Sequence, residues 1–283
     1  MKRKFVGMIW LGLFLFACEK HMDIHLPYEG DKIVVNTLIQ PDSVIYIRVT
    51  RSVPTNVYDE SGYKDIRKAS VTLLEDSLPI APLQVQEISG LFYFVTTQKA
   101  IRGKRYTVEV AAPGLQAITA TDTLPLLPEV NNATAQKNSN RVQFTLRDRP
   151  GAADYYRIRI MVTHTDETIS WLLFRLDPAF NNNLVDFFTS GTYNSLVMSD
   201  ERFNGKEINF VLQTADLLTD VTRVTVEVSS LTHDTYQYFS TVLAQKENTG
   251  IIIGAPVRVF TNVVNGYGIV GGINTKKMSF KLE

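Results

Sequence analysis

From Lys32 onward, the chain consists of short segments rich in Val, Ile, Thr and Tyr that are separated by turn residues at intervals of about ten. β-Branched and aromatic side chains favour the extended backbone, whereas Gly, Pro, Asn and Asp interrupt it. In one such segment, the alternation of apolar and polar residues puts Tyr106, Val108 and Val110 on the same face of a strand. The pattern predicts an all-β fold in which half-buried sheets pack face to face.

We expect two β-sandwich domains in series, because the roughly 265 residues that remain without the N-terminal signal favour two domains over one. Residues 31–124 contain seven segments, as in an immunoglobulin-like or fibronectin-like sandwich, and residues 125–283 predict a second sandwich. Around the boundary, Asp122–Pro128 has two prolines that cannot donate ladder hydrogen bonds, so a stiff linker is expected there. The strands expected in the first sandwich are Ile33–Ile39, Val44–Thr50, Ala69–Glu75, Leu83–Ile88, Leu91–Thr96, Tyr106–Ala111 and Gln116–Thr121. Those expected in the second are Val142–Leu146, Tyr155–Thr163, Ile169–Leu176, Leu184–Thr189, Glu207–Gln213, Thr222–Ser229, Ile251–Ile253, Val257–Phe260, Gly268–Ile273 and Met278–Leu282.

One short helix is predicted in the second sandwich, at residues 232–245. Thr232 is a suitable N-cap, and Tyr236, Phe239 and Leu243 recur at helical spacing. We expect this helix to cover one end of the sandwich. Elsewhere, Asn204-Gly205 is a strong signal for a type I′ hairpin turn.

The N-terminus has the features of a lipoprotein signal peptide, predicted at residues 1–17. Three basic residues at positions 2–4 precede Phe5–Phe16, which is almost wholly apolar. At ~1.5 Å per residue this run spans roughly 18 Å, well short of the ~30 Å hydrocarbon core of a bilayer. An export signal is therefore predicted in place of a membrane-spanning helix.

Cys18 ends this run and is the predicted lipidation site. Leu15 and Ala17 stand where a lipoprotein signal peptidase requires a branched apolar and a small residue. The alternative is an ordinary signal peptide cut after Ala17, but that enzyme requires a small residue at the position of Leu15. Several acyl chains on Cys18 would anchor the protein stably, since each buried CH₂ contributes ~0.8 kcal/mol. Residues 18–30 are then a lipidated tether to the membrane.

Composition argues against several functional classes. The 29 Lys and Arg residues balance the 29 Asp and Glu residues, so no nucleic-acid partner is expected. Cys18 is the only cysteine, which leaves the body without a disulfide or a thiolate metal site. The four scattered histidines predict no metal site, and the sequence lacks a Gly-x-Ser-x-Gly elbow, a Walker loop and a His-Glu-x-x-His motif. We therefore expect no cofactor and no enzymatic activity.

Two motifs imitate functional sites. Gly266–Gly271 spells the dinucleotide-binding fingerprint, but only twelve residues follow it, and the fingerprint needs an acidic residue about twenty positions on. These glycines are expected to allow a tight turn and close backbone packing of the last strands. His164–Glu167 could form a metal or acid-base cluster, and we interpret it as a polar turn between strands.

Two loops are candidate binding surfaces. The first, residues 177–195, mixes asparagines with aromatic rings that could stack on sugars or anchor a partner. The second, residues 53–66, is long for a sandwich connection. The alternative interpretations are inward-packing aromatics for the first and a solvated loop for the second. The candidate residues are Phe180, Asn182, Phe187, Phe188 and Tyr193 in the first loop, and Tyr58 and Tyr63 in the second.

Three segments in order, residues 200–206, 231–238 and 261–272, resemble the Bacteroidota lipoproteins catalogued as domain of unknown function 4249. The resemblance covers nearly the whole chain after the signal. It implies an outer-membrane lipoprotein, displayed at the cell surface and often encoded beside a TonB-dependent transporter. It also implies O-glycosylation at Asp-Ser/Thr-apolar triplets, which here would modify Ser43, Ser77 and Thr123.

Three functions follow as hypotheses. The leading one is a binding or accessory subunit that acts with a TonB-dependent β-barrel importer. The second is a structural envelope assembly or adhesion lipoprotein that binds no small ligand. The third is a hydrolase with an unrecognised site.

Overall fold

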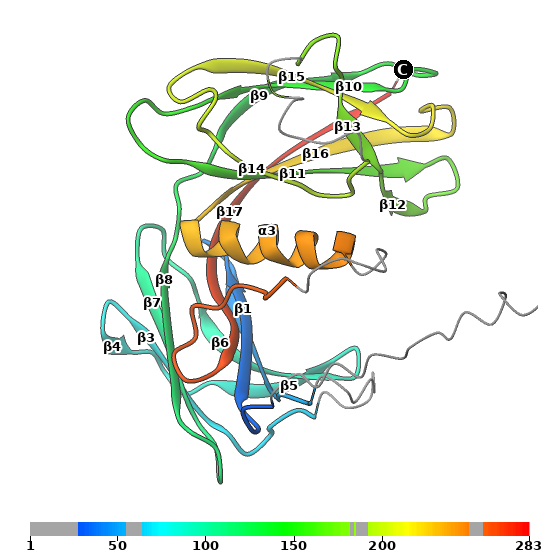
Figure 1. Ribbon diagram of the computed structural model, residues 1–283. Coiled ribbons are helices and arrows are strands. Elements are labelled where there is room, and N and C mark those ends of the chain that lie inside the picture. The colour runs from blue at the N-terminus through cyan, green and yellow to red at the C-terminus, as the bar shows by residue number, and fades with distance from the viewer. Residues whose placement is uncertain (1–27, 55–63, 182–183, 185–191, 249–256, 283) are drawn as a thin grey trace, which may run out of the picture.

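The computed structural model describes residues 28–54, 64–181, 184, 192–248 and 257–282. The prediction of an all-β fold is confirmed, because strands make up most of the described chain and α3 (His233–Asn248) is the helix among its named elements. Figure 1 shows two layered β regions, one above the other, with α3 lying between them. Cys18, the signal peptide, and Tyr58 and Tyr63 of the second candidate loop lie outside the described residues.

Within the described residues, the strands form one large sheet and two small sheets. The large sheet contains β1 (Ile33–Ile39), β2 (Val44–Arg51), β5 (Gln84–Ile88), β6 (Leu91–Lys99), β11 (Tyr155–His164), β12 (Ile169–Trp171), β14 (Leu196–Ser199), β16 (Val221–Leu231) and β17 (Tyr267–Lys281). Its order is β12-β11-β16-β17-β1-β2-β6-β5, and β14 also pairs with β11. The first small sheet contains β3 (Ser70–Glu75), β4 (Leu78–Pro79), β7 (Arg105–Ala111) and β8 (Ile118–Thr123). The second contains β9 (Glu129–Ala135), β10 (Arg141–Arg147), β13 (Phe174–Leu176) and β15 (Glu207–Thr214).

Each small sheet packs on a different part of the large sheet, which produces two sandwiches with separate hydrophobic cores. In the first core, Tyr106, Val108 and Val110 of β7 are almost wholly buried, as their alternation predicts. In the second core, the rings of Phe144 and Phe210 stack with centroids 5.3 Å apart. Full burial of such a side chain contributes roughly 1.5–3 kcal/mol. Because the period-2 pattern decides which side chains are buried, it is the main determinant of both sandwiches.

The predicted division into residues 31–124 and 125–283 does not separate the two sandwiches completely, because the C-terminal part of the chain contributes to both. Val263 and Val270 come from the C-terminal end of the chain but pack in the first core. The chain therefore returns to the first sandwich after building most of the second.

β17 joins the two sandwiches, and Figure 1 shows it as a long strand running from one to the other. Its first residues, Tyr267–Gly272, pair in parallel with β1, and the following residues pair with β16 in antiparallel orientation. Two separate strands were expected over Gly268–Ile273 and Met278–Leu282, and the structure has one continuous strand. The large sheet is continuous because this strand belongs to both halves.

Glycines allow the close approach of β17 to its neighbours. Gly268 has a φ of +103°, and a Cβ atom there would lie 1.9 Å from the carbonyl oxygen of Val35 in β1. At Gly272, a Cβ atom would lie 1.8 Å from the carbonyl oxygen of Thr123. The expectation of close backbone packing in this segment is confirmed.

α3 lies across the face of the large sheet between the two sandwiches, where we had expected it at one end of the second (Figure 1). Thr232 caps its N-terminus, since its Oγ1 accepts a hydrogen bond from the Thr235 amide at 3.3 Å. Asp122, predicted as part of a linker, accepts hydrogen bonds from the Thr232 hydroxyl at 2.5 Å and the Gly272 amide at 2.8 Å. This carboxylate therefore connects β8, α3 and β17 at one point.

Several strand predictions need correction. The expected strand Ile169–Leu176 is two strands, because β12 pairs with β11 in the large sheet and β13 pairs with β15 in the second small sheet. β4, β9 and β14 were not predicted, and Val257–Phe260 forms no strand. Ile251–Ile253 and most of Leu184–Thr189 lie outside the described residues.

Asn204-Gly205 does not form the expected hairpin turn. Only Gly205 of the pair has positive φ, and the flanking strands β14 and β15 do not pair with each other. The Asn204 side chain instead donates to the carbonyl oxygen of Ala152 at 2.7 Å and accepts from the amide of Gly151 at 3.1 Å. Its amide group thus links two loops, which a turn motif read from sequence does not reveal.

Candidate functional site

The aromatic candidates of the first loop do not form one described surface. The Phe180 ring is 58% exposed and lies 5.3 Å from the Arg141 guanidinium carbon. Tyr193 is half-buried and packs against the second core, so the inward-packing interpretation holds for it. Asn182, Phe187 and Phe188 lie outside the described residues.

The triplets for O-glycosylation all lie at strand ends or turns. Ser77 is exposed in the turn between β3 and β4, Thr123 is exposed at the end of β8, and Ser43 is half-buried before β2. Their modification stays a prediction. His164 and the residues after it form the expected polar turn, in which His164 Nε2 lies 2.8 Å from the Ser170 hydroxyl.

Three buried aspartates that the sequence did not single out meet in the second sandwich. Asp148 follows β10, Asp154 precedes β11 and Asp200 follows β14, and one carboxylate oxygen of each lies within 4.8 Å of the other two. Burial raises the pKa of Asp200, and the neighbouring charges of Asp148 and Asp154 add to that shift. The physical reason is that a charged carboxylate loses hydration and faces two like charges.

Protein donors hold each of these aspartates. Tyr156 donates to Asp148 at 2.7 Å, and Arg149 donates two hydrogen bonds to Asp154, one of them from Nε at 3.0 Å. Asn204 donates to Asp200 at 3.0 Å. Carboxylates this close together can coordinate Ca²⁺ or Mg²⁺, so Asp148, Asp154 and Asp200 are the described residues that could hold a metal. Their existing bonds instead connect the β10–β11 loop to the segment after β14.

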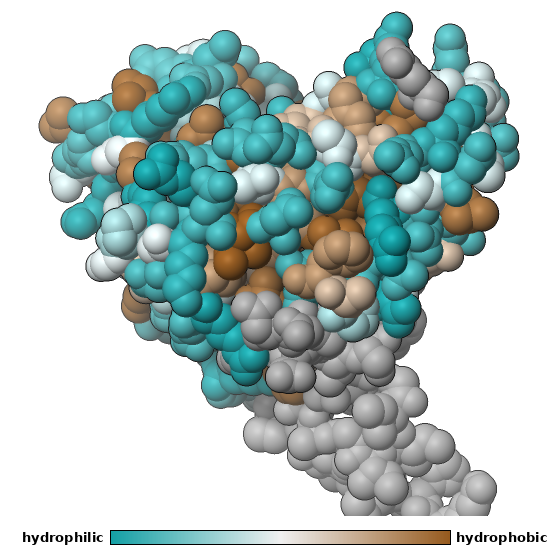
Figure 2. All heavy atoms as spheres, turned by 90° about the horizontal axis from the view of Figure 1, so that it is seen from above, coloured by the Kyte–Doolittle hydropathy of each residue, from teal (hydrophilic) through white to brown (hydrophobic). Residues whose placement is uncertain are grey.

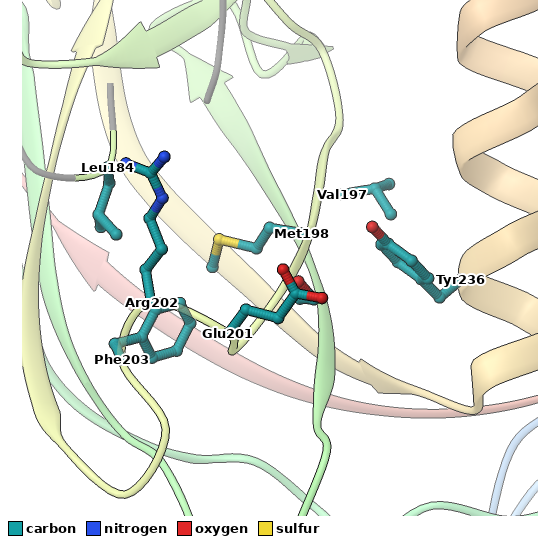
Figure 3. Close-up of a pocket in the computed structure, with 8 residues that line it drawn as sticks. Leu184, Val197, Met198, Glu201, Arg202, Phe203 and Tyr236 are labelled. Atoms are coloured by element: carbon teal, nitrogen blue, oxygen red, sulfur yellow. The ribbon is translucent and has the colours of Figure 1, made fainter. Parts of the chain in front are cut away.

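Two pockets lie beside β14 and α3, and both are lined in part by Val197. The smaller, about 50 Å³, is lined by Met198 of β14, by Phe203 and by Tyr236 of α3, whose side chain projects from the helix with its hydroxyl toward Val197 (Figure 3). Because a water molecule occupies about 30 Å³, this space suits one or two waters. It is too small for an organic ligand.

The larger pocket has a volume of about 240 Å³, room for roughly eight waters. Two arginines of β11 line it, Arg157 and Arg159, together with Trp171 of β12 and Phe239 of α3. We call it the arginine pocket. From the side of the second sandwich the surface is mostly hydrophilic, with apolar side chains gathered in a central hollow (Figure 2).

Sequence reasoning missed the arginine pocket, although a signal was present. Residues 155–162 read Tyr-Tyr-Arg-Ile-Arg-Ile-Met-Val, and the alternation buries Tyr156, Ile158 and Ile160 in the core. The same alternation must turn Arg157 and Arg159 to the other face of the sheet. The alternation could therefore have shown that two charges lie on the outer face of this strand, although the helix that covers this face was expected at an end of the sandwich.

Two sandwiches that share one large sheet, with a helix over that sheet and a charged pocket beneath it, define an all-β protein of the sandwich class. The chain belongs to the family described as Domain of unknown function (DUF4249), whose family model matches residues 19–279. The family prediction is therefore confirmed. No curated protein matches the chain. Among the described residues, no helix is long and apolar enough to cross a membrane.

Proposed function

We propose that this protein is a lipid-anchored outer-membrane protein that acts as a binding or accessory subunit of a TonB-dependent nutrient importer. The lipobox Leu15–Cys18 behind a short apolar run is the observation that carries the proposal. Membership of the family supports it, since the resemblance implies a lipoprotein that works beside such a transporter.

Binding, as opposed to catalysis, is supported by how the polar side chains are used. The buried carboxylates that could act as acids or bases are engaged by Tyr156, Arg149 and Asn204. The arginine pocket, in contrast, combines charged and aromatic surface around an open volume large enough for a small ligand.

Cell fractionation tests the anchor. In the wild type the protein should sediment with the outer membrane, and Cys18→Ala should move it to the soluble fraction because the acyl chains are lost. His21→Ala, three residues away in the tether, is the matched control and should stay with the membrane. Retention of Cys18→Ala in the membrane fraction would refute lipid anchoring.

A pull-down from native membranes tests the partner. A C-terminally tagged protein extracted in mild detergent should co-purify a β-barrel transporter in stoichiometric amount, identified by mass spectrometry. Recovery of the tagged protein with no such barrel would count against the importer and favour the structural envelope role. Protease treatment of intact cells would show in the same strain whether the body faces the outside.

A further inference from the structure

The arginine pocket holds more positive charge than the carboxylates of the described residues neutralise. Arg159 donates to Glu227 at 2.6 Å, and Lys277 binds the same carboxylate at 2.6 Å. Glu227 is buried, so its single negative charge is shared between two cations. Within the described residues, no acidic side chain lines the pocket, and no carboxylate bonds to Arg157.

Arg157 is the uncompensated charge. Its Nε is enclosed, and no hydrogen-bond acceptor lies within reach of it among the described residues. Burial and the positive charge of Arg159 together lower the pKa of Arg157 to about 10, although the nearby charge of Glu227 acts in the opposite direction. The side chain is still protonated at neutral pH, so a cation is kept in a partly desolvated place with no carboxylate bonded to it among the described residues, which costs free energy.

Aromatic rings hold the two guanidinium groups in place. The guanidinium carbon of Arg157 lies 4.8 Å from the Phe239 ring centroid, and that of Arg159 lies 4.1 Å from the Trp171 centroid. Stacking of this kind orients a planar guanidinium and leaves its N–H edge available to a ligand. Two arginines fixed side by side with an open volume next to them are typical of an oxyanion site.

We propose that the arginine pocket binds a small organic anion whose carboxylate or phosphate group accepts hydrogen bonds from Arg157. Val197, Val242 and Leu243 line the same pocket and provide apolar contact for the body of the ligand. Asn194 and Ser195 provide neutral polar groups at its edge. The pocket is smaller than those that hold drug-sized ligands, which restricts the ligand to a small one.

Thermal melting of the soluble body tests the proposal, because a ligand of the folded state must raise Tm. Benzoate is the first probe, and benzamide, which has the same ring without the charge, is its matched control. Inorganic phosphate at equal ionic strength distinguishes a free oxyanion from one that needs an apolar body. We expect benzoate or phosphate to raise Tm and benzamide to have no effect.

Arg157→Met should abolish the anion-induced rise in Tm and weaken binding at least tenfold in titration calorimetry. Without ligand, this variant should melt at the same temperature as the wild type or higher, because a partly desolvated charge without a carboxylate partner is replaced by an apolar side chain. Arg175→Gln removes a charge from β13 that does not line the pocket and whose hydrogen-bond partner is Gln213, so this variant should bind the anion like the wild type. An undiminished benzoate effect in Arg157→Met, an equal effect of benzamide, or no effect of either anion would overturn the proposal.

The proposal rests on the binding role given above and does not depend on the anchor or the importer. Failure of the anion test with a transporter still recovered in the pull-down would remove the pocket and leave the accessory role. Anion binding without a recovered transporter would support the pocket and count against the importer.

Discussion

Gly268→Ala is predicted to be among the most damaging single substitutions in the chain. A methyl group at this position would lie 1.9 Å from the Val35 carbonyl oxygen, so β17 could not keep its pairing with β1. A left-handed backbone at φ +103° adds strain of ~1–2 kcal/mol for any L-residue. Separation of β17 from β1 at this point would break about three backbone hydrogen bonds, each of which contributes ~1 kcal/mol.

The expected loss is therefore about 4–5 kcal/mol, a large part of the roughly 5–15 kcal/mol by which domains are stable. Gly114→Ala is the matched control. Gly114 has a φ of +74°, and a Cβ atom there would meet nothing within 4 Å. The control carries the backbone strain without the collision and should lose only ~1–2 kcal/mol.

Urea unfolding of the soluble body measures both variants. With a slope of about 3 kcal/mol per molar urea, the midpoint of Gly268→Ala should fall about 1 M below that of Gly114→Ala. Trp171, the only tryptophan after Cys18, reports on the second sandwich, whereas circular dichroism reports on all strands. Because β17 joins the sandwiches, both signals should shift together. Equal midpoints for the two variants would refute the steric argument, and a shift in circular dichroism alone would refute the coupling.

Two further predictions concern buried carboxylates. Burial raises the pKa of Asp122, so its protonation stabilises the folded state below the unfolded pKa, and this contribution is lost as the pH rises through the folded pKa. The stability of the wild type relative to Asp122→Asn should therefore fall as the pH rises above about 4, the unfolded pKa of Asp, and a constant difference would contradict the assignment. Burial opposes the ionisation of Glu227, but hydrogen bonds from Lys277 and Arg159 lower its pKa overall. The ionised Glu227 therefore stabilises the folded state above the unfolded pKa, and this stabilisation is lost as the pH falls through the folded pKa. Glu227→Gln should cost about 1–3 kcal/mol at neutral pH and less in acid, as measured by urea midpoints; an equal cost at both would contradict this.

The strands themselves were largely predictable from sequence, because period-2 alternation is a local property. β1, β2, β10 and β15 were each predicted within one or two residues, and Tyr106 was correctly placed in a core. β9 was missed because it begins directly after Pro128 and carries two asparagines, residues that are rare in strands.

Which strands pair was not predictable, because partners are decided by packing between distant parts of the chain. β1 and β17 are separated by more than two hundred residues and form the parallel pair that joins the sandwiches.

The aspartate site could not be predicted from the sequence for the same reason. Asp148, Asp154 and Asp200 lie in loops whose meeting depends on the register of β10, β11 and β14, and no spacing in the sequence records it.

Arg157 differs from three other arginines of the second sandwich in a way that connects fold to function. Arg141 and Arg149 reach the carboxylates of Asp177 and Asp154, and Arg159 reaches Glu227, so in these three places the chain supplies a carboxylate for the guanidinium. Arg157 lies against the Phe239 ring, but within the described residues its partner is not a protein carboxylate. A helix over a sheet could have been packed more favourably with an apolar side chain at that position, since unpaired buried charge lowers stability. The cost is understandable if the counter-ion arrives with a ligand, and the Tm of Arg157→Met without ligand measures that cost directly.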